Sequence, residues 1–247
     1  MTYSVILPTL NEKNHIIQLI EEIARIFQKV KKHFEIIVVD DNSSDGTIEI
    51  LKKYEKTVDF LKVKVREGKK KNLDSSINEG IIEAQNEFVI WMDADFQHNP
   101  SAIEDLIKFS SEYNFVICSR FVKGSVRYFD KFSDNKTFNE PQSILFNKFC
   151  KFFIFNDLTD FTSGYTCIRK SIISNYSLKG YYGEYFLELI FYCKQNKIKI
   201  VEIPFKENER ASGTSKTGTM SFSYLIISAY YFLCFLKCFI KKIIYRL

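Results

Sequence analysis

The sequence has little glycine and proline and no cysteine pairing pattern. Nine glycines and four prolines among 247 residues leave no low-complexity or repetitive segment, which excludes a disordered or fibrous chain. The six cysteines never form a CxxC pair and lie far apart or in apolar stretches, so they are expected to be core residues and not a disulfide framework. No secretory leader opens the chain at Met1, and we therefore expect reduced cysteines and a cytoplasmic location.

No apolar run is long enough for a lone membrane-spanning helix. The longest run, residues 222–236, ends at Lys237 after about fifteen residues, short of the roughly twenty that cross a bilayer. Basic residues then recur at helical spacing among apolar ones: Lys237, Lys241, Lys242 and Arg246. This pattern favours a helix at an anionic membrane surface, and the alternative is a helix packed on the domain or on a partner subunit. We expect a catalytic domain over 1–218 and a peripheral helix over 219–247 at the cytoplasmic face of a membrane.

Apolar, strand-like runs alternate with segments of helical periodicity. The runs cover residues 3–7, 34–39, 61–65, 88–92 and 115–118. This alternation predicts an α/β fold, a mostly parallel sheet flanked by helices. Further on, we expect a long functional loop at 119–140, a helix from 141 to about 155, a strand near 165–168, a helix near 183–195 and a strand at 199–203. His15 and His33 are expected on exposed helix surfaces.

Four polar segments follow the first four strands. They cover residues 8–12, 40–47, 66–71 and 93–100. Since the carboxyl ends of parallel strands line one crevice, we expect these segments to meet at one site. Asp93 and Asp95 stand directly after the apolar run, and two carboxylates there can hold a divalent cation against a diphosphate.

At these segments the chain resembles the family 2 glycosyltransferases of the GT-A fold, and within them the polyprenyl-phosphate sugar transferases of the dolichyl-phosphate mannose synthase type. The matching motifs are PTLNE at 8–12, DDNSSDGT at 40–47, DADFQHNP at 93–100, SRF at 119–121, TSGY at 162–165 and RASGTSK at 210–216. The chain departs from the pattern at Asn72, where the family has glycine, and at 139–140, where it has arginine.

The resemblance implies a binding site for a nucleotide sugar and a metal ion. It assigns the nucleoside pocket to four residues: Pro8, Leu10, Glu12 and Asp41. It assigns Mg²⁺ or Mn²⁺ and the diphosphate to the loop with Asp93, Ala94, Asp95 and Gln97. The ion would neutralise the charge that grows on the departing nucleotide, so Asp95 counts as catalytic. Arg210 and Lys216 would close over the diphosphate from a loop that acts as a lid.

The implied acceptor is a polyprenyl phosphate, which needs cations more than a general base. Its phosphate is already anionic near neutral pH, since the second pKa of a phosphate monoester is near 6. Arg120 is the first candidate to bind this phosphate, with Lys123, Arg127 and Lys131 as possible helpers. A single displacement would invert the anomeric configuration. His98 matches the mannosyl type, which favours GDP-mannose over a UDP-hexose as donor.

Three other functions are alternatives to this one. Transfer to a saccharide hydroxyl would need a base, for which the candidates are Asp157, Asp160, Glu184 and Glu188. A non-catalytic sensor of sugar nucleotides would keep the pocket without turnover. A nucleotidyltransferase is disfavoured because no glycine-rich signature opens the first loop. No nucleic-acid partner is expected, since the lysines are mostly scattered.

Overall fold

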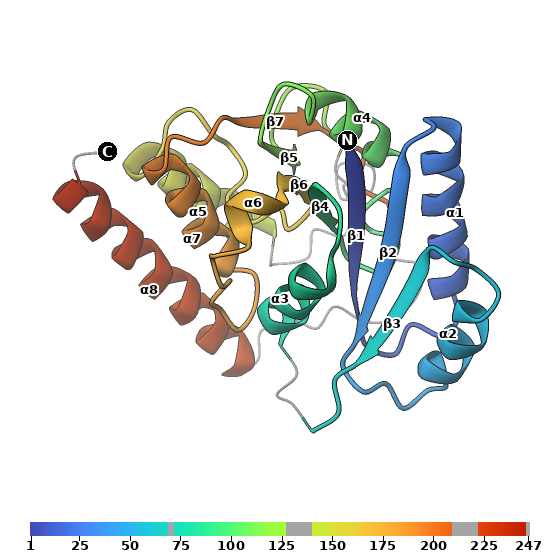
Figure 1. Cartoon of the computed structure of the whole chain (residues 1–247). Coiled ribbons are helices and arrows are strands. Elements are labelled where there is room, and N and C mark those ends of the chain that lie inside the picture. The colour runs from blue at the N-terminus through green and yellow to red at the C-terminus, as the bar shows by residue number, and fades with distance from the viewer. Residues whose placement is uncertain (69–71, 127–139, 209–221, 246–247) are drawn as a thin grey trace.

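A seven-stranded sheet forms the centre of the molecule. The computed structural model describes residues 1–68, 72–126, 140–208 and 222–245 (Figure 1). The strands are β1 (Thr2–Thr9), β2 (His33–Asp40), β3 (Leu61–Val65), β4 (Phe88–Trp91), β5 (Phe115–Ser119), β6 (Thr166–Arg169) and β7 (Ile200–Pro204). Their order across the sheet is β3-β2-β1-β4-β6-β5-β7.

The sheet is parallel except at β6. β1 pairs in parallel with β2 and β4, β2 with β3, and β5 with β7. β6 runs antiparallel between β4 and β5. The carboxyl ends of β1 to β4 therefore lie at the same edge of the sheet, and the mostly parallel sheet predicted from the sequence is confirmed.

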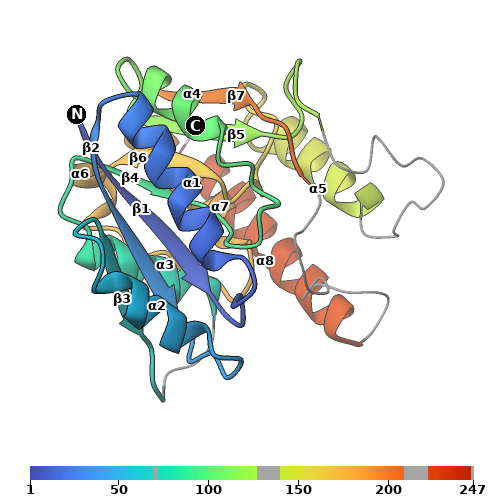
Figure 2. The same cartoon turned by 90° about the vertical axis from the view of Figure 1, so that its right-hand side faces the viewer.

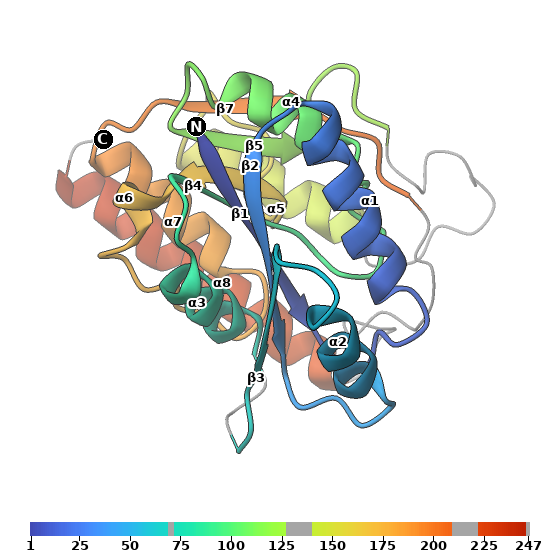
Figure 3. The ribbon, with the colours of Figure 1, turned by 45° about the vertical axis from the view of Figure 1, so that its right-hand side comes forward.

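Helices cover both faces of the sheet (Figures 2 and 3). They are α1 (Ile16–Lys29), α2 (Thr47–Glu55), α3 (Leu73–Glu83), α4 (Ala102–Phe109), α5 (Glu140–Phe153), α6 (Lys170–Ile173), α7 (Tyr185–Gln195) and α8 (Phe222–Tyr245). Strand side chains alternate between the two faces, so Val5 and Leu7 pack with α1 and α4, whereas Ile6 packs with α3 and α7. Both cores are apolar, which explains why the strands read as continuous hydrophobic runs.

The carboxyl-terminal helix α8 packs on α7 along one side (Figure 3). Lys237 on α8 contacts both carboxylate oxygens of Glu188 on α7, at 2.7 and 2.8 Å. The opposite side of α8 exposes large apolar side chains: Leu225, Phe232, Leu233, Ile240, Ile243 and Ile244. Among the described residues, no helix has the length and apolar character needed to cross a membrane.

All six cysteines are buried and form no disulfide, as the sequence predicted. The expectation for the two histidines was wrong in part. His33 is exposed but begins strand β2 instead of lying on a helix. His15 immediately precedes α1 and is only 5% exposed, because loops from distant parts of the sequence cover it.

Candidate active site

The loops after β1 and β2 are joined at the carboxyl edge of the sheet. The backbone N–H of Asn11 donates to the Ser43 hydroxyl at 2.8 Å, and that of Glu12 donates to Thr47 Oγ1 at 3.0 Å. Asn11 itself takes a left-handed conformation with φ of 59°, which turns the chain sharply out of β1. Pro8, Leu10 and Glu12 are half-buried and Asp41 is buried, so these four predicted donor-site residues lie at the same strand ends.

Asp41 is bound by an arginine that sequence reasoning did not single out. Arg66, the first residue after β3, is 4% exposed and donates Nη1 to the Asp41 carboxylate. Ser76 on α3 donates to the same Asp41 oxygen at 3.0 Å, and Glu79 accepts from Arg66 Nε at 3.1 Å. The only sequence signal for this role was the position of Arg66 directly after a strand that neighbours the Asp41 strand.

The acidic loop after β4 presents its two aspartates differently. The Asp93 side chain is 42% exposed, whereas Asp95 is 5% exposed. Asp95 Oδ1 accepts from the Gln97 N–H at 3.0 Å, and Phe96 between them has a φ of 66°. Asp93 donates its N–H to His98 Nδ1 at 3.0 Å, and the His98 ring stacks on Tyr165 with 4.9 Å between centroids. His98 therefore fixes the backbone of the acidic loop.

His15 connects the first loop to the acidic loop. Its Nε2 lies 2.9 Å from Glu12 Oε2, and its ring packs edge-on against Phe96 at 6.0 Å. Burial lowers the pKa of His15, while a hydrogen bond with the backbone of Ala94 and the charge of Asp95 oppose this shift. The predicted nucleoside loop and the predicted metal loop thus share one buried side chain.

The segment after β7 runs along the acidic loop. Gln97 Nε2 donates to Glu207 Oε1 at 3.1 Å, and the Asn208 N–H donates to the Gln97 carbonyl at 3.0 Å. Gln97 belongs to the loop of the predicted metal site, and its amide nitrogen donates to Glu207. Arg210 and Lys216, the predicted lid residues, lie outside the described residues.

Arg120, the predicted acceptor residue, is bound by Asp160. Its Nε donates to Asp160 Oδ2 at 2.9 Å, and its Nη2 donates to Asp160 Oδ1 at 2.8 Å and to Thr162 Oγ1 at 2.7 Å. Burial raises the pKa of Asp160, but the charge and hydrogen bonds of Arg120 outweigh it and hold this pKa below its usual value. Lys123 is exposed, and the other two predicted helpers, Arg127 and Lys131, lie outside the described residues.

The donor atoms at the acidic loop fit a hard divalent cation. No group of three or more acidic, histidine or cysteine side chains gathers in the described parts of the chain as a self-contained metal site. Mg²⁺, however, is commonly held by one or two carboxylates and completes its shell with substrate phosphate and water. The part-exposed Asp93 and the adjacent Asp95 would supply those carboxylates.

Residues 4–177 match the sequence profile of glycosyl transferase family 2. The chain belongs to this family. The matched residues include the loops after β1, β2 and β4 described above. The prediction made from the six short motifs is confirmed at the level of the family and the fold.

Three relatives with established names share about a third of their aligned residues with this chain. A dolichol-phosphate mannosyltransferase of Pyrococcus furiosus is 32% identical over 227 residues, which cover 91% of this chain and 62% of that protein. A dolichol-phosphate mannosyltransferase of Saccharomyces cerevisiae is 32% identical over 123 residues, 49% of this chain and 46% of the other. The poly(ribitol-phosphate) β-N-acetylglucosaminyltransferase TarS of Staphylococcus aureus is 32% identical over 124 residues, 50% of this chain and 21% of its own. The chain thus spans less than two thirds of the length of each.

Solved structures share the fold at low sequence identity. Glucosyl-3-phosphoglycerate synthase of Mycobacterium tuberculosis, crystallised with Mn²⁺ and UDP, superposes with a TM-score of 0.67 at 15% identity over 96% of this chain and 79% of that one. S. aureus TarS superposes with a TM-score of 0.58 at 21% identity over 84% of this chain and 59% of that one. These likenesses establish the GT-A fold alone.

Proposed function

We propose that this glycosyltransferase moves a hexose from a nucleotide sugar to a polyprenyl phosphate. The preferred donor in this proposal is GDP-mannose, which supplies mannose. The observation that carries the proposal is the similarity to the P. furiosus dolichol-phosphate mannosyltransferase over 91% of this chain. UDP-hexoses are the alternative donors, because the contacts at Glu12 and Asp41 do not by themselves select a base.

In this proposal Asp93 and Asp95 would hold Mg²⁺ or Mn²⁺, and the bound ion would supply positive charge to the departing nucleoside diphosphate. Glu12 and Asp41 accept hydrogen bonds from the nucleoside, with Pro8 and Leu10 as apolar neighbours. The acceptor phosphate attacks the anomeric carbon without a general base, and one displacement inverts the configuration.

The four carboxylates that are candidate bases for a hydroxyl acceptor each bind another group of the protein, which supports a phosphate acceptor. Asp157 pairs with Lys194, and Asp160 binds Arg120. Glu184 accepts from the backbone N–H groups of Tyr181 and Tyr182, at 2.8 and 2.9 Å. Glu188 on α7 forms an ion pair with Lys237 of α8.

The apolar side of α8 supports membrane attachment. It continues onto α5, where Phe152 is 79% exposed, and the two helices meet through Phe153, which contacts Phe235 and Phe239. Exposed or half-buried lysines lie on the same two helices: Lys148, Lys151, Lys241 and Lys242. We propose a catalytic domain over 1–218 and an attachment helix over 219–247 at the cytoplasmic face of a membrane.

Radiolabelled sugar transfer tests the proposal. Wild-type protein should move label from GDP-mannose, and less from UDP-glucose, onto a short polyprenyl phosphate that partitions into organic solvent. Asp95→Asn should abolish this transfer in the presence of Mg²⁺ or Mn²⁺. The control Asp59→Asn, at an exposed position before β3, should transfer sugar like the wild type. Full activity of Asp95→Asn would exclude the metal role.

A saccharide acceptor is the second candidate, supported by the sequence similarity to TarS. In the same assay it would put the label into the aqueous polymer fraction when a polysaccharide acceptor is added. Appearance of label there, and none in the organic phase, would replace the proposed acceptor with this one.

A further inference from the structure

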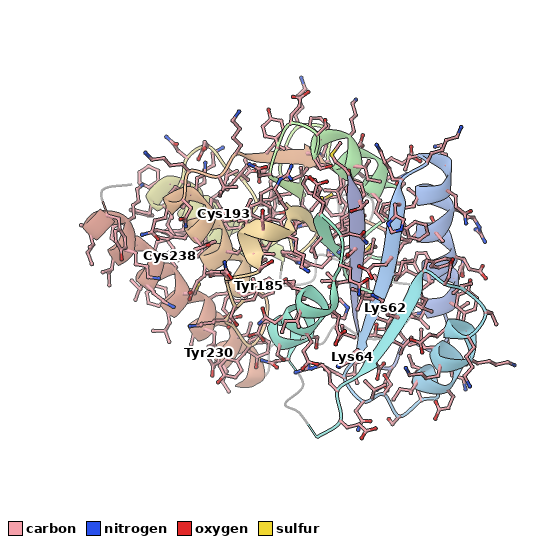
Figure 4. The ribbon with its side chains drawn as sticks, in the orientation of Figure 1. Lys62, Lys64, Tyr185, Cys193, Tyr230 and Cys238 are labelled. Atoms are coloured by element: carbon pink, nitrogen blue, oxygen red, sulfur yellow. The ribbon has the colours of Figure 1, made fainter. Side chains whose placement is uncertain are left out.

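A groove of about 410 Å³ lies between α7, α8 and the segment after α6. Lys179 comes from that segment, Gln195 from α7, and Lys237 and Lys241 from the carboxyl-terminal half of α8. Cys238, labelled in Figure 4, lies in the lining between the two α8 lysines. The carboxyl-terminal half of α8 lies away from the carboxyl ends of β1 and β2, so the groove is separate from the catalytic edge (Figure 1).

The groove is positively charged and rich in hydrogen-bond donors. Of the described residues that line it, three are lysines and Glu188 is the carboxylate, and Glu188 is paired with Lys237. Lys179 and Lys241 therefore leave excess positive charge in the groove. Polar side chains from the segment after α6 and from α7 add donors: Asn175, Ser177 and Gln195. An anion with several oxygen acceptors matches this lining.

The lining also explains how a lysine can sit beside apolar surface. Lys241 Nζ lies 5.9 Å from the centroid of the Phe191 ring, so its aliphatic stem covers apolar surface while its ammonium group reaches the groove. Tyr176 and Tyr192 stack at 4.3 Å between centroids and form a firm aromatic wall.

The neighbouring surface decides which anion fits. Apolar side chains three or four residues from Lys237 and Lys241 on α8 are exposed, with Leu233 62%, Ile240 55% and Ile244 67% exposed. A ligand with a phosphate in the groove and a hydrocarbon chain along this strip would match both surfaces. A free phosphate would contact the groove but not the apolar strip.

We propose that this groove binds the phosphate of an anionic phospholipid whose acyl chains lie along the apolar side of α8. The site is distinct from the reaction centre and does not depend on which sugar or acceptor the enzyme uses. It would give α8 a preferred headgroup as well as a general attraction to the membrane.

Soluble short-chain lipids test this site without a charged vesicle surface. Calorimetric titration of the full chain with dihexanoyl phosphatidylglycerol, kept below its micelle concentration, should show saturable binding. Lys179→Gln combined with Lys241→Gln should weaken that binding about tenfold or more. The control pair Lys53→Gln and Lys56→Gln, which removes the same charge from exposed positions at the end of α2, should leave it unchanged. Circular dichroism melting checks that both variants fold.

Three kinds of outcome would overturn the proposal. The first is no saturable binding by the wild-type chain, or binding that the groove variant retains. The second is equal affinity for dihexanoyl phosphatidylcholine, which carries no net charge. The third is equally tight binding of inorganic phosphate, which would make the groove a free-phosphate site. As a further check, Glu188→Gln removes the carboxylate of the groove and should tighten phosphatidylglycerol binding severalfold.

Discussion

The Arg120–Asp160 pair allows a quantitative prediction for Asp160→Asn. Asp160 is fully buried and accepts five hydrogen bonds: three from the N–H, Nε and Nη2 of Arg120, and two from the N–H and the hydroxyl of Thr162. The substitution keeps the size of the side chain but removes the charge that balances Arg120. Breaking a buried ion pair from one side costs about 3–5 kcal/mol.

The expected loss for Asp160→Asn lies at the lower end of that range. The Arg120 side chain is 20% exposed, so water can solvate part of its charge, and the Thr162 hydroxyl still accepts from Nη2. We expect about 3 kcal/mol of lost stability, which lowers the midpoint of thermal unfolding by about 6–12 °C in a chain of this size.

Urea unfolding of wild type, Asp160→Asn, Arg120→Met and the double variant measures the coupling between the two side chains. The double variant should be more stable than either single variant, because no uncompensated charge remains. A loss below about 1 kcal/mol for Asp160→Asn would refute the reasoning, since that is the value of an exposed pair.

The same pair predicts how the stability depends on pH. The folded pKa of Asp160 is lowered relative to its unfolded value of about 3.9, so the pair stabilises the fold fully above that value. As the pH falls through the lower folded pKa, this contribution is lost. The difference between wild type and Asp160→Asn should therefore be constant from about pH 5 to 8 and shrink in more acidic solution.

Three further changes give separate tests. Gly80→Ala should destabilise by about 1–3 kcal/mol in urea unfolding, because the added Cβ would lie 2.4 Å from Ile6 Cγ2 in the core; a neutral effect would contradict the packing of α3 on β1. His15→Phe should raise the KM for the nucleotide sugar severalfold and leave that for the acceptor unchanged, with His33→Gln as the exposed control; an unchanged donor KM would remove the link between Glu12 and the acidic loop. Deletion of 220–247 should abolish sedimentation with vesicles containing anionic phospholipid, and retained binding would assign membrane attachment to another surface.

The order of strands and helices could be predicted because both the sheet and its covering helices are apolar on their buried faces. The direction of β6 could not, since a four-residue apolar strand reads the same whether it runs parallel or antiparallel. The convergence of the acidic loop with the loops after β1 and β2 followed from the parallel sheet alone.

The individual contacts of the candidate site were less predictable. Gln97 and Glu207 are 110 residues apart in the sequence, and no local pattern indicates their pairing. His15 precedes an amphipathic helix and resembles a surface residue, but Phe96 from the acidic loop covers it. Such burial depends on which loops the fold brings together, and it therefore cannot be read from helical periodicity.

The segment before α7 lies between α3 and α8. Asp74 on α3 accepts from the Gly180 N–H at 3.1 Å on one side of this segment. On the other side, the Tyr231 hydroxyl of α8 approaches Gly183 so closely that an added Cβ would lie 2.4 Å from it. Burial raises the pKa of Tyr185, which follows this segment, and the negative charge of Asp93 raises it further. A displacement of α8 toward α7 would therefore press on this segment, which leads directly into α7 and Tyr185.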